Sequence, residues 1–129
     1  MKKIILIAAM LLTFGSTANA ACTRADLTGS WVAYSTGAYS NAARTSFTVP
    51  AKGNVVSGTS LSANGVSGTG DFTITSFDKS CHFVGYSFDG TGTTYFDAYV
   101  SKGKDSMSGM WYESVGTNFY SGSFNASKQ

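Results

Sequence analysis

The sequence predicts an all-β protein that forms a single eight-stranded antiparallel up-and-down β-barrel with one disulfide. Three observations support this fold. Residues 21–129 hold 18 serines, 13 threonines and 14 glycines but only two leucines and one isoleucine, so strong helix formers are scarce. Eight phenylalanines, seven tyrosines and two tryptophans in the same range supply the volume of a core. Turn signals recur at short, regular intervals, as they do in hairpins.

The first 20 residues predict a secretory signal peptide. Lys2 and Lys3 form a positive n-region, residues 4–14 form an apolar h-region of 11 residues, and residues 18–20 form a small-x-small cleavage site. An apolar run of 11 residues is too short to span a bilayer as a helix, so we expect no membrane-spanning segment after cleavage. The Lys-Lys start indicates a bacterial protein that is periplasmic or secreted. Residues 21–129 would form one β-barrel domain.

The turn signals divide residues 21–129 into eight strand-like runs. In chain order, the predicted strands are 28–36, 44–51, 54–62, 66–76, 81–88, 93–101, 106–114 and 118–126. The turns after the second strand are Lys52-Gly53-Asn54, Asn64-Gly65, Asp78-Lys79-Ser80, Asp89-Gly90-Thr91-Gly92, Lys102-Gly103-Lys104-Asp105 and Val115-Gly116-Thr117-Asn118. No gap is long enough for a crossover helix, so each strand is expected to pair with the next. Only 37–43 is a longer connection, and it could cap one end.

Side-chain alternation supports these strands. In 94–100 one face carries Thr94, Phe96, Ala98 and Val100, and the other carries three polar or tyrosine side chains. Eight antiparallel strands close most economically into a barrel, which removes both sheet edges. Such a barrel can be filled by side chains or can hold one small ligand. The glycines inside the strands predict bulges or tight bends at Gly58, Gly68, Gly85, Gly109 and Gly122.

The two cysteines of residues 21–129, Cys22 and Cys81, predict a disulfide, because an even count in an exported chain is typical of a disulfide framework. The alternative is a lipoprotein in which Cys22 is the acylated first residue, since residues 20–22 partly fit such a site.

Charge and residue types exclude several functions. Of nine lysines and arginines, two lie in the leader, which leaves seven against seven acidic residues. A neutral chain is not expected to bind nucleic acid, whose phosphates need excess cations. His82 is the one histidine and has no second ligand at metal spacing, no Gly-x-Ser-x-Gly elbow is present, and the carboxylates are scattered. We therefore expect no enzyme activity, no cofactor and no metal.

The segment Leu27-Thr28-Gly29-Ser30-Trp31 resembles the start of the calycin barrels, which include lipocalins, fatty-acid-binding proteins and avidins. In those families the tryptophan packs across one end of the barrel, so the resemblance implies that Gly29 and Trp31 close the barrel. Two later stretches resemble avidin strands that carry binding-site aromatics and hydroxyls, namely 82–88 with 93–96, and Met110-Trp111-Tyr112.

The resemblance also implies a ligand site at the open end of the barrel. Its ring walls would be Tyr86, Tyr95 and Trp111, and its polar contacts would be Thr91, Thr93 and Tyr120. The positions that avidins use to bind the biotin ureido oxygen fall near Ala33 and Ser60, which removes two of its partners. The expected ligand is therefore a small, partly apolar molecule other than biotin.

These observations predict an exported, non-catalytic protein that binds a small, partly apolar ligand in the open end of a β-barrel. Two alternatives remain. The start at 27–32 also resembles bacterial periplasmic inhibitors of secreted metalloproteases, whose inhibitory residues lie in an N-terminal tail; here that tail is about six residues. The second alternative is a surface barrel that binds a protein partner or self-associates as a homo-oligomer, because near-zero net charge favours association.

Overall fold

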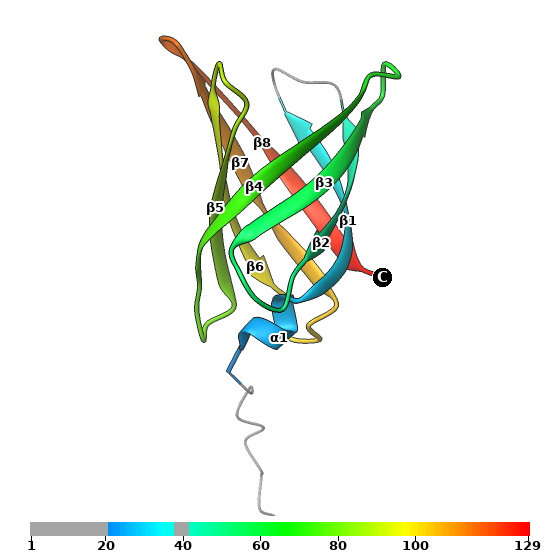
Figure 1. Cartoon of the computed structure of the whole chain (residues 1–129), viewed down its shortest axis with the longest axis vertical. Coiled ribbons are helices and arrows are strands. Elements are labelled where there is room, and N and C mark those ends of the chain that lie inside the picture. The colour runs from blue at the N-terminus through cyan, green and yellow to red at the C-terminus, as the bar shows by residue number, and fades with distance from the viewer. Residues whose placement is uncertain (1–20, 38–41) are drawn as a thin grey trace, which may run out of the picture.

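The computed structural model describes residues 21–37 and 42–129, so the predicted signal peptide lies outside the described residues. One short helix, α1 (Arg24–Leu27), precedes the strands, and it is not long or apolar enough to cross a membrane. The strands are β1 (Gly29–Gly37), β2 (Ala43–Val49), β3 (Val55–Ser62), β4 (Ser67–Phe77), β5 (His82–Phe88), β6 (Thr93–Val100), β7 (Ser106–Val115) and β8 (Asn118–Lys128). They surround one interior (Figure 1).

Each strand is antiparallel to the one before it, and β8 pairs with β1 to close the ring. The predicted all-β, eight-stranded up-and-down barrel is therefore confirmed, and the strand bounds agree within two residues. β2 ends earlier than predicted, before Pro50, because proline has no N–H for the ladder. β8 runs further than predicted because Ser127 and Lys128 pair with β1 at the seam.

Side chains alternate between the interior and the outer wall along each strand. In β6 the face that carries Phe96 is the inner one: Ala98 and Val100 are buried, and Phe96 packs against the core. The residues between them, such as Tyr95 and Tyr99, are exposed. The core is thus the inside of the barrel, which has no second sheet to pack against.

The strand glycines have two different roles. Gly85 faces Ile74, next to a bulge in β4 where the register shifts between Ile74 and Ser76. Gly122 instead allows close backbone approach, since a Cβ at that position would overlap the carbonyl oxygen of Thr36 in β1. The expectation of bulges therefore fits Gly85, whereas at Gly122 the need for glycine comes from the neighbouring strand.

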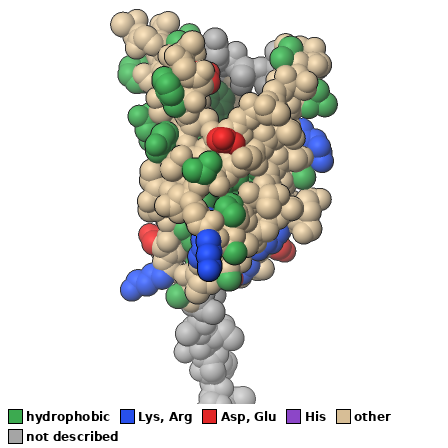
Figure 2. All heavy atoms as spheres, in the orientation of Figure 1, with side chains coloured by type: hydrophobic (Ala, Val, Ile, Leu, Met, Phe, Trp, Pro, Cys, Tyr) green, Lys and Arg blue, Asp and Glu red, His purple; other side chains and the backbone are tan. Residues whose placement is uncertain are grey.

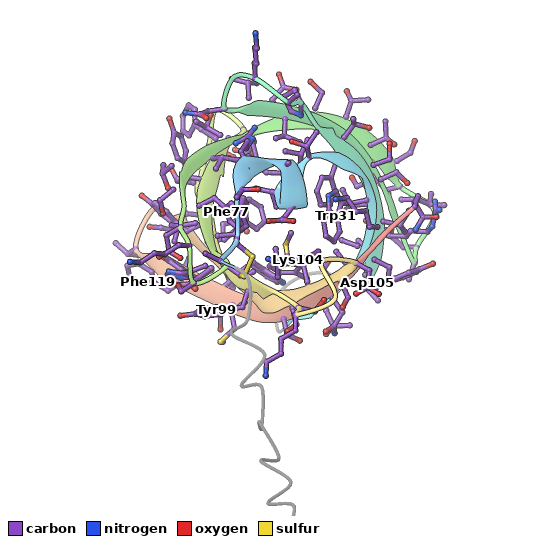
Figure 3. The ribbon with its side chains drawn as sticks, turned by 90° about the horizontal axis from the view of Figure 1, so that it is seen from below. Trp31, Phe77, Tyr99, Lys104, Asp105 and Phe119 are labelled. Carbon is purple, nitrogen blue, oxygen red and sulfur yellow. A yellow bond between two sulfur atoms is a disulfide. The ribbon has the colours of Figure 1, made fainter. Side chains whose placement is uncertain are left out.

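Helix α1 plugs the lower end of the barrel in Figure 1, and a view from below shows it inside the ring of strands with Trp31 against the inner wall (Figure 3). Leu27 is fully buried, and the Trp31 Nε1–H donates a hydrogen bond of 2.9 Å to its carbonyl oxygen. The Lys128 ammonium donates to the carbonyl oxygen of Asp26 over 2.9 Å. The helix is therefore held by the first and last strands of the barrel.

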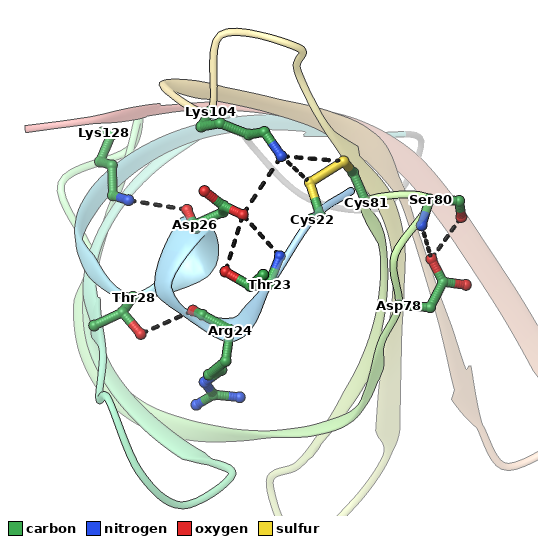
Figure 4. A network of polar contacts seen from close by, with 10 residues as sticks. All are labelled: Cys22, Thr23, Arg24, Asp26, Thr28, Asp78, Ser80, Cys81, Lys104 and Lys128. Atoms are coloured by element: carbon green, nitrogen blue, oxygen red, sulfur yellow. Dashed lines mark hydrogen bonds and ion pairs between the residues drawn. A yellow bond between two sulfur atoms is a disulfide. The ribbon is translucent and has the colours of Figure 1, made fainter. Parts of the chain in front are cut away.

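The predicted disulfide joins Cys22 to Cys81, which anchors α1 to the turn before β5 (Figure 4). Cys22 therefore has no thiol for acylation, and the lipoprotein alternative does not fit this pairing. The Lys104 ammonium lies 2.7 Å from the Cys22 sulfur and 3.4 Å from Oδ2 of Asp26. A disulfide of this kind is typical of proteins in oxidising compartments outside the cytoplasm.

Candidate functional site

An apolar cavity of about 300 Å³ lies inside the barrel, above α1. It extends from the helix towards the opposite end, where Figure 2 shows the rim notched and hydrophobic side chains deep in the notch. Its apolar lining consists of Leu27, Ala33, Phe47, Val49, Phe72, Phe83, Phe96, Met107, Trp111 and Phe124. Sites for small molecules begin at about this volume and share this mostly apolar lining.

Phenylalanine rings form the walls of the cavity. The Phe72 ring centroid lies 5.4 Å from that of Phe47, 5.7 Å from Phe96 and 6.1 Å from Phe83. Phe96 in turn contacts Phe124, with centroids 6.2 Å apart. Most of these pairs meet edge to face, a favoured arrangement that adds to the stabilisation from burial. The rings hold one another in place, so the walls exist before any ligand arrives.

Trp111 forms a further wall, and its orientation is fixed by β1 and β8. Its Nε1–H donates a hydrogen bond of 3.1 Å to the carbonyl oxygen of Thr36. Its ring lies so close to Gly37 and Gly122 that a Cβ at either position would overlap it. Because the indole N–H is already bonded to the backbone, Trp111 offers a ligand its ring surface and not a hydrogen-bond donor.

The polar lining residues of the cavity are Ser35, Thr45, Thr94 and Glu113. A neighbouring hollow of about 220 Å³ shares Thr45 and three phenylalanine walls with the cavity, and adds Ser60, Gly70 and Ser87. Hydroxyls and glycines thus line the interior beyond the phenylalanine cluster. The interior is apolar near α1 and polar towards the open end, so it suits a molecule with one apolar and one polar end.

Of the described residues that line the cavity, Glu113 alone is ionisable. It is half-buried on β7 and pairs with Thr94 of β6 and Tyr120 of β8. Its Oε1 lies 3.4 Å from the point that a Cβ on Gly92 would occupy, so the carboxylate reaches the turn between β5 and β6 at the open end. Within residues 21–37 and 42–129, no hydrogen bond or ion pair engages this carboxylate.

Three of the predicted ligand contacts stand on the outer wall. Tyr86, Thr93 and Tyr95 alternate with the inward residues of β5 and β6, and Tyr86 and Tyr95 are 38% and 39% exposed. The neighbouring side chains that do line the interior are one position away, at Ser87, Thr94 and Phe96. The cause is the two-residue period of a strand, since a shift of one residue moves a side chain to the opposite face. Contact of the outer three with a ligand stays a prediction.

The other three predicted contacts divide differently. Trp111 lines the cavity as expected, and Tyr120 packs against the core beside Glu113. Thr91 is exposed in the turn after β5, where its hydroxyl and its N–H both donate to Asp89 Oδ1. Hydrogen bonds from the N–H of Gly92, then the hydroxyl and the N–H of Thr91, lower the pKa of Asp89 to about 2. Thr91 therefore shapes the rim of the open end.

The phenylalanine walls and Glu113 were not among the residues expected to contact a ligand. The sequence does contain a signal for them: the face of β6 with Phe96 is more apolar than the face with Tyr95, which places Phe96 inside. Phe96 pairs with Trp111 across β6 and β7, so Trp111 is on the inner face of β7 as well. Glu113 lies two residues after Trp111, and the two-residue period of a strand places it on the same inner face.

Exposed aromatic side chains concentrate on the outer wall of β5 to β8. Tyr86, Tyr95 and Tyr112 lie opposite one another on three neighbouring strands, and the rings of Tyr95 and Tyr112 stack with centroids 5.0 Å apart. The His82 ring stacks on Tyr99 at 4.6 Å, and its Nε2 lies 2.8 Å from Oδ1 of Asp97. This outer aromatic face is separate from the cavity, because the wall of the barrel lies between them.

In sequence comparisons, no protein-family model matches the chain, and no curated protein matches it significantly.

Proposed function

We propose that this protein is an exported, non-catalytic barrel that binds a small, partly apolar molecule in the cavity between α1 and the open end. The observation that carries this proposal is the interior itself: about 300 Å³, walled by fixed phenylalanine rings and Trp111, and bordered by hydroxyls. Walls that are already in place reduce the entropy lost on binding. The chain would be a calycin-type barrel, as the Gly29-Ser30-Trp31 motif implies, working in the periplasm or outside the cell.

The proposal can be tested with N-phenyl-1-naphthylamine, a neutral apolar dye that fluoresces in dry surroundings. We expect saturable binding to the wild-type protein at one site per barrel. Replacing Ala33, which lines the cavity, by leucine fills part of its volume and should weaken the dye by at least about tenfold. The control is Ser46→Leu, which adds a similar side chain to the outer wall of the adjacent strand, since Ser46 lies opposite Val32 and not Ala33, and neither Ser46 nor Val32 lines the cavity.

Equal dye binding by both variants would contradict the proposal, because the dye would then bind the outer surface. Thermal melting of each variant shows whether it folds. If Ala33→Leu does not fold, Thr94→Leu provides a second filling substitution on β6, three strands from β1 around the ring, with Thr93→Leu as its outward control.

A second candidate function is self-association through the outer aromatic face. The specific observation that favours it is a row of exposed tyrosines formed by Tyr86, Tyr95 and Tyr112. Protein–protein interfaces are enriched in tyrosine. Residues 21–129 carry equal numbers of acidic and basic residues, so copies do not repel one another. Sedimentation velocity with Tyr95→Ser/Tyr112→Ser tests it: we expect dimers that this variant abolishes, and a concentration-independent monomer would contradict it.

A further inference from the structure

The charge at the mouth of the cavity has one sign. Among the residues that the structure describes, Glu113 is the one charged residue of the cavity lining, and no lysine or arginine contributes to it. The other polar lining residues, Ser35, Thr45 and Thr94, carry hydroxyls that can accept hydrogen bonds as well as donate them. An incoming polar head therefore meets one carboxylate and several hydroxyl acceptors, and no cation among the described lining residues.

The rest of the barrel has the same asymmetry. Residues 21–129 contain seven lysines and arginines, and six belong to α1, to the turns that surround it, or to the end of β8: Arg24, Lys52, Lys79, Lys102, Lys104 and Lys128. Contacts hold three of these turns around α1. Arg24 Nη2 donates to the carbonyl oxygen of Gly53, Lys104 reaches Asp26, and the N–H of Cys22 donates to the carbonyl oxygen of Lys79. In Figure 2 most of the Lys and Arg side chains accordingly lie around this end.

The seventh cation does not alter the charge inside the mouth. Arg44 lies opposite Tyr34 and Leu61 in the ladder, and both of these side chains are exposed, so Arg44 is on the outer wall. Asp89, in the turn between β5 and β6, adds a second carboxylate to the rim. A ligand that approaches the open end thus meets negative potential, which attracts cations and repels anions.

We propose that the cavity selects amphiphiles with a protonated amine head, with Glu113 as the residue that binds the ammonium group and the phenylalanine rings around the apolar body. This inference rests on the proposed function, since it names the chemical class that the same cavity takes. Ser35, Thr45 and Thr94 accept further N–H bonds from the head. An alkyl carboxylate of the same length would place its charge next to Glu113 with no cation to compensate, so fatty acids are rejected.

The test compares three probes of one chain length at pH 7: n-octylamine, n-octanol and octanoate, each displacing N-phenyl-1-naphthylamine from the wild-type protein. A partly screened ion pair at the mouth should make octylamine bind about tenfold more tightly than octanol, and octanoate about tenfold more weakly. Glu113→Gln should bring the affinities of all three probes within about twofold of one another. Asp97→Asn, which removes the same charge from the outer wall, should leave the order as it is in wild type.

Raising the salt concentration gives a measurement that needs no variant: octylamine binding to wild type should weaken, whereas octanol binding should not. Equal binding of the three probes, tighter binding of octanoate, or an amine preference that survives Glu113→Gln would each overturn the selection by Glu113 while leaving a binding cavity in place. Failure of the dye and of all three probes to bind would instead overturn the proposed function. The two failures are therefore distinguishable.

Discussion

Removal of the disulfide is the perturbation whose cost can be worked out most directly. Cys22 and Cys81 close a loop with a sequence separation of 59 residues. In the chain-entropy model, a loop of that length lowers the entropy of the unfolded chain enough to contribute about 4 kcal/mol at 25 °C. Small domains are stable by about 5–15 kcal/mol in total, so the variant Cys22→Ala/Cys81→Ala should lose a large share of its free energy of unfolding.

The structure predicts that this variant still folds with α1 in place. Leu27 remains fully buried, and the helix keeps hydrogen bonds from Lys128 to the Asp26 carbonyl oxygen and from Arg24 to the carbonyl oxygens of Pro50 and Gly53. These contacts belong to the folded state and do not depend on the sulfur atoms. The loss should therefore arise in the unfolded chain, and dye binding in the cavity should be unchanged.

Urea titration followed by tryptophan fluorescence measures both quantities, because Trp31 and Trp111 are buried in the barrel. The variant and the chemically reduced wild-type protein should agree with each other, which controls for the alanine side chains. A loss below about 1 kcal/mol would refute the entropic argument. A loss of dye binding would refute the claim that the non-covalent contacts hold α1.

Three further changes follow from particular contacts. Gly122→Ala should lower the free energy of unfolding, measured by urea titration, by more than about 2 kcal/mol, because the added methyl group would overlap the backbone of β1 and the Trp111 indole. The control is Gly70→Ala, where an added Cβ would have no atom within 4 Å. It should change the free energy of unfolding by less than about 0.5 kcal/mol. The carboxyl of Asp89 has a pKa of about 2 in the folded chain against its usual 3.8, so the unfolded chain binds more protons between these pH values, and stability falls as the pH drops through this window. In thermal melts from pH 5 to pH 2, the melting temperature of Asp89→Asn should therefore fall less than that of the wild-type protein. An equal fall in both proteins would contradict this role of Asp89. Trp31→Phe removes the hydrogen-bond donor of the buried Leu27 carbonyl oxygen. It should therefore lower the free energy of unfolding by about 1–3 kcal/mol more than the smaller ring alone would. A loss that the smaller ring fully explains would show that another donor replaces the indole.

The strands could be predicted from the sequence because their signals are local. Gly65, Gly90 and Gly116 adopt positive φ in turns that the sequence had located. No connection between the predicted strands is long enough for a crossover helix, so each strand could pair only with its neighbours in the chain. The up-and-down topology could therefore be predicted as well. The Cys22–Cys81 pairing needed no geometry, since the two cysteines of the chain allow only one disulfide.

The candidate site was predicted only in part. Trp111 was assigned to it and lines the cavity, but Tyr86, Thr93 and Tyr95 are on the outer wall. Pattern resemblance locates a strand well, yet the face of a residue changes with a shift of one position. Glu113 was considered only as one of several scattered carboxylates, because spacing along the chain does not show that it borders the phenylalanine cluster.

The sequence by itself determined the class, number and order of the strands, and the disulfide, because hydrophobic period, turn chemistry and cysteine count act over a few residues. The tertiary structure alone decided that the interior is hollow above α1. It also decided that the cations gather at the plugged end and that one carboxylate faces the cavity. These properties depend on how the eight strands close into a ring and on which side chains then face the same interior. Patterns over a few neighbouring residues do not show which distant residues come close together.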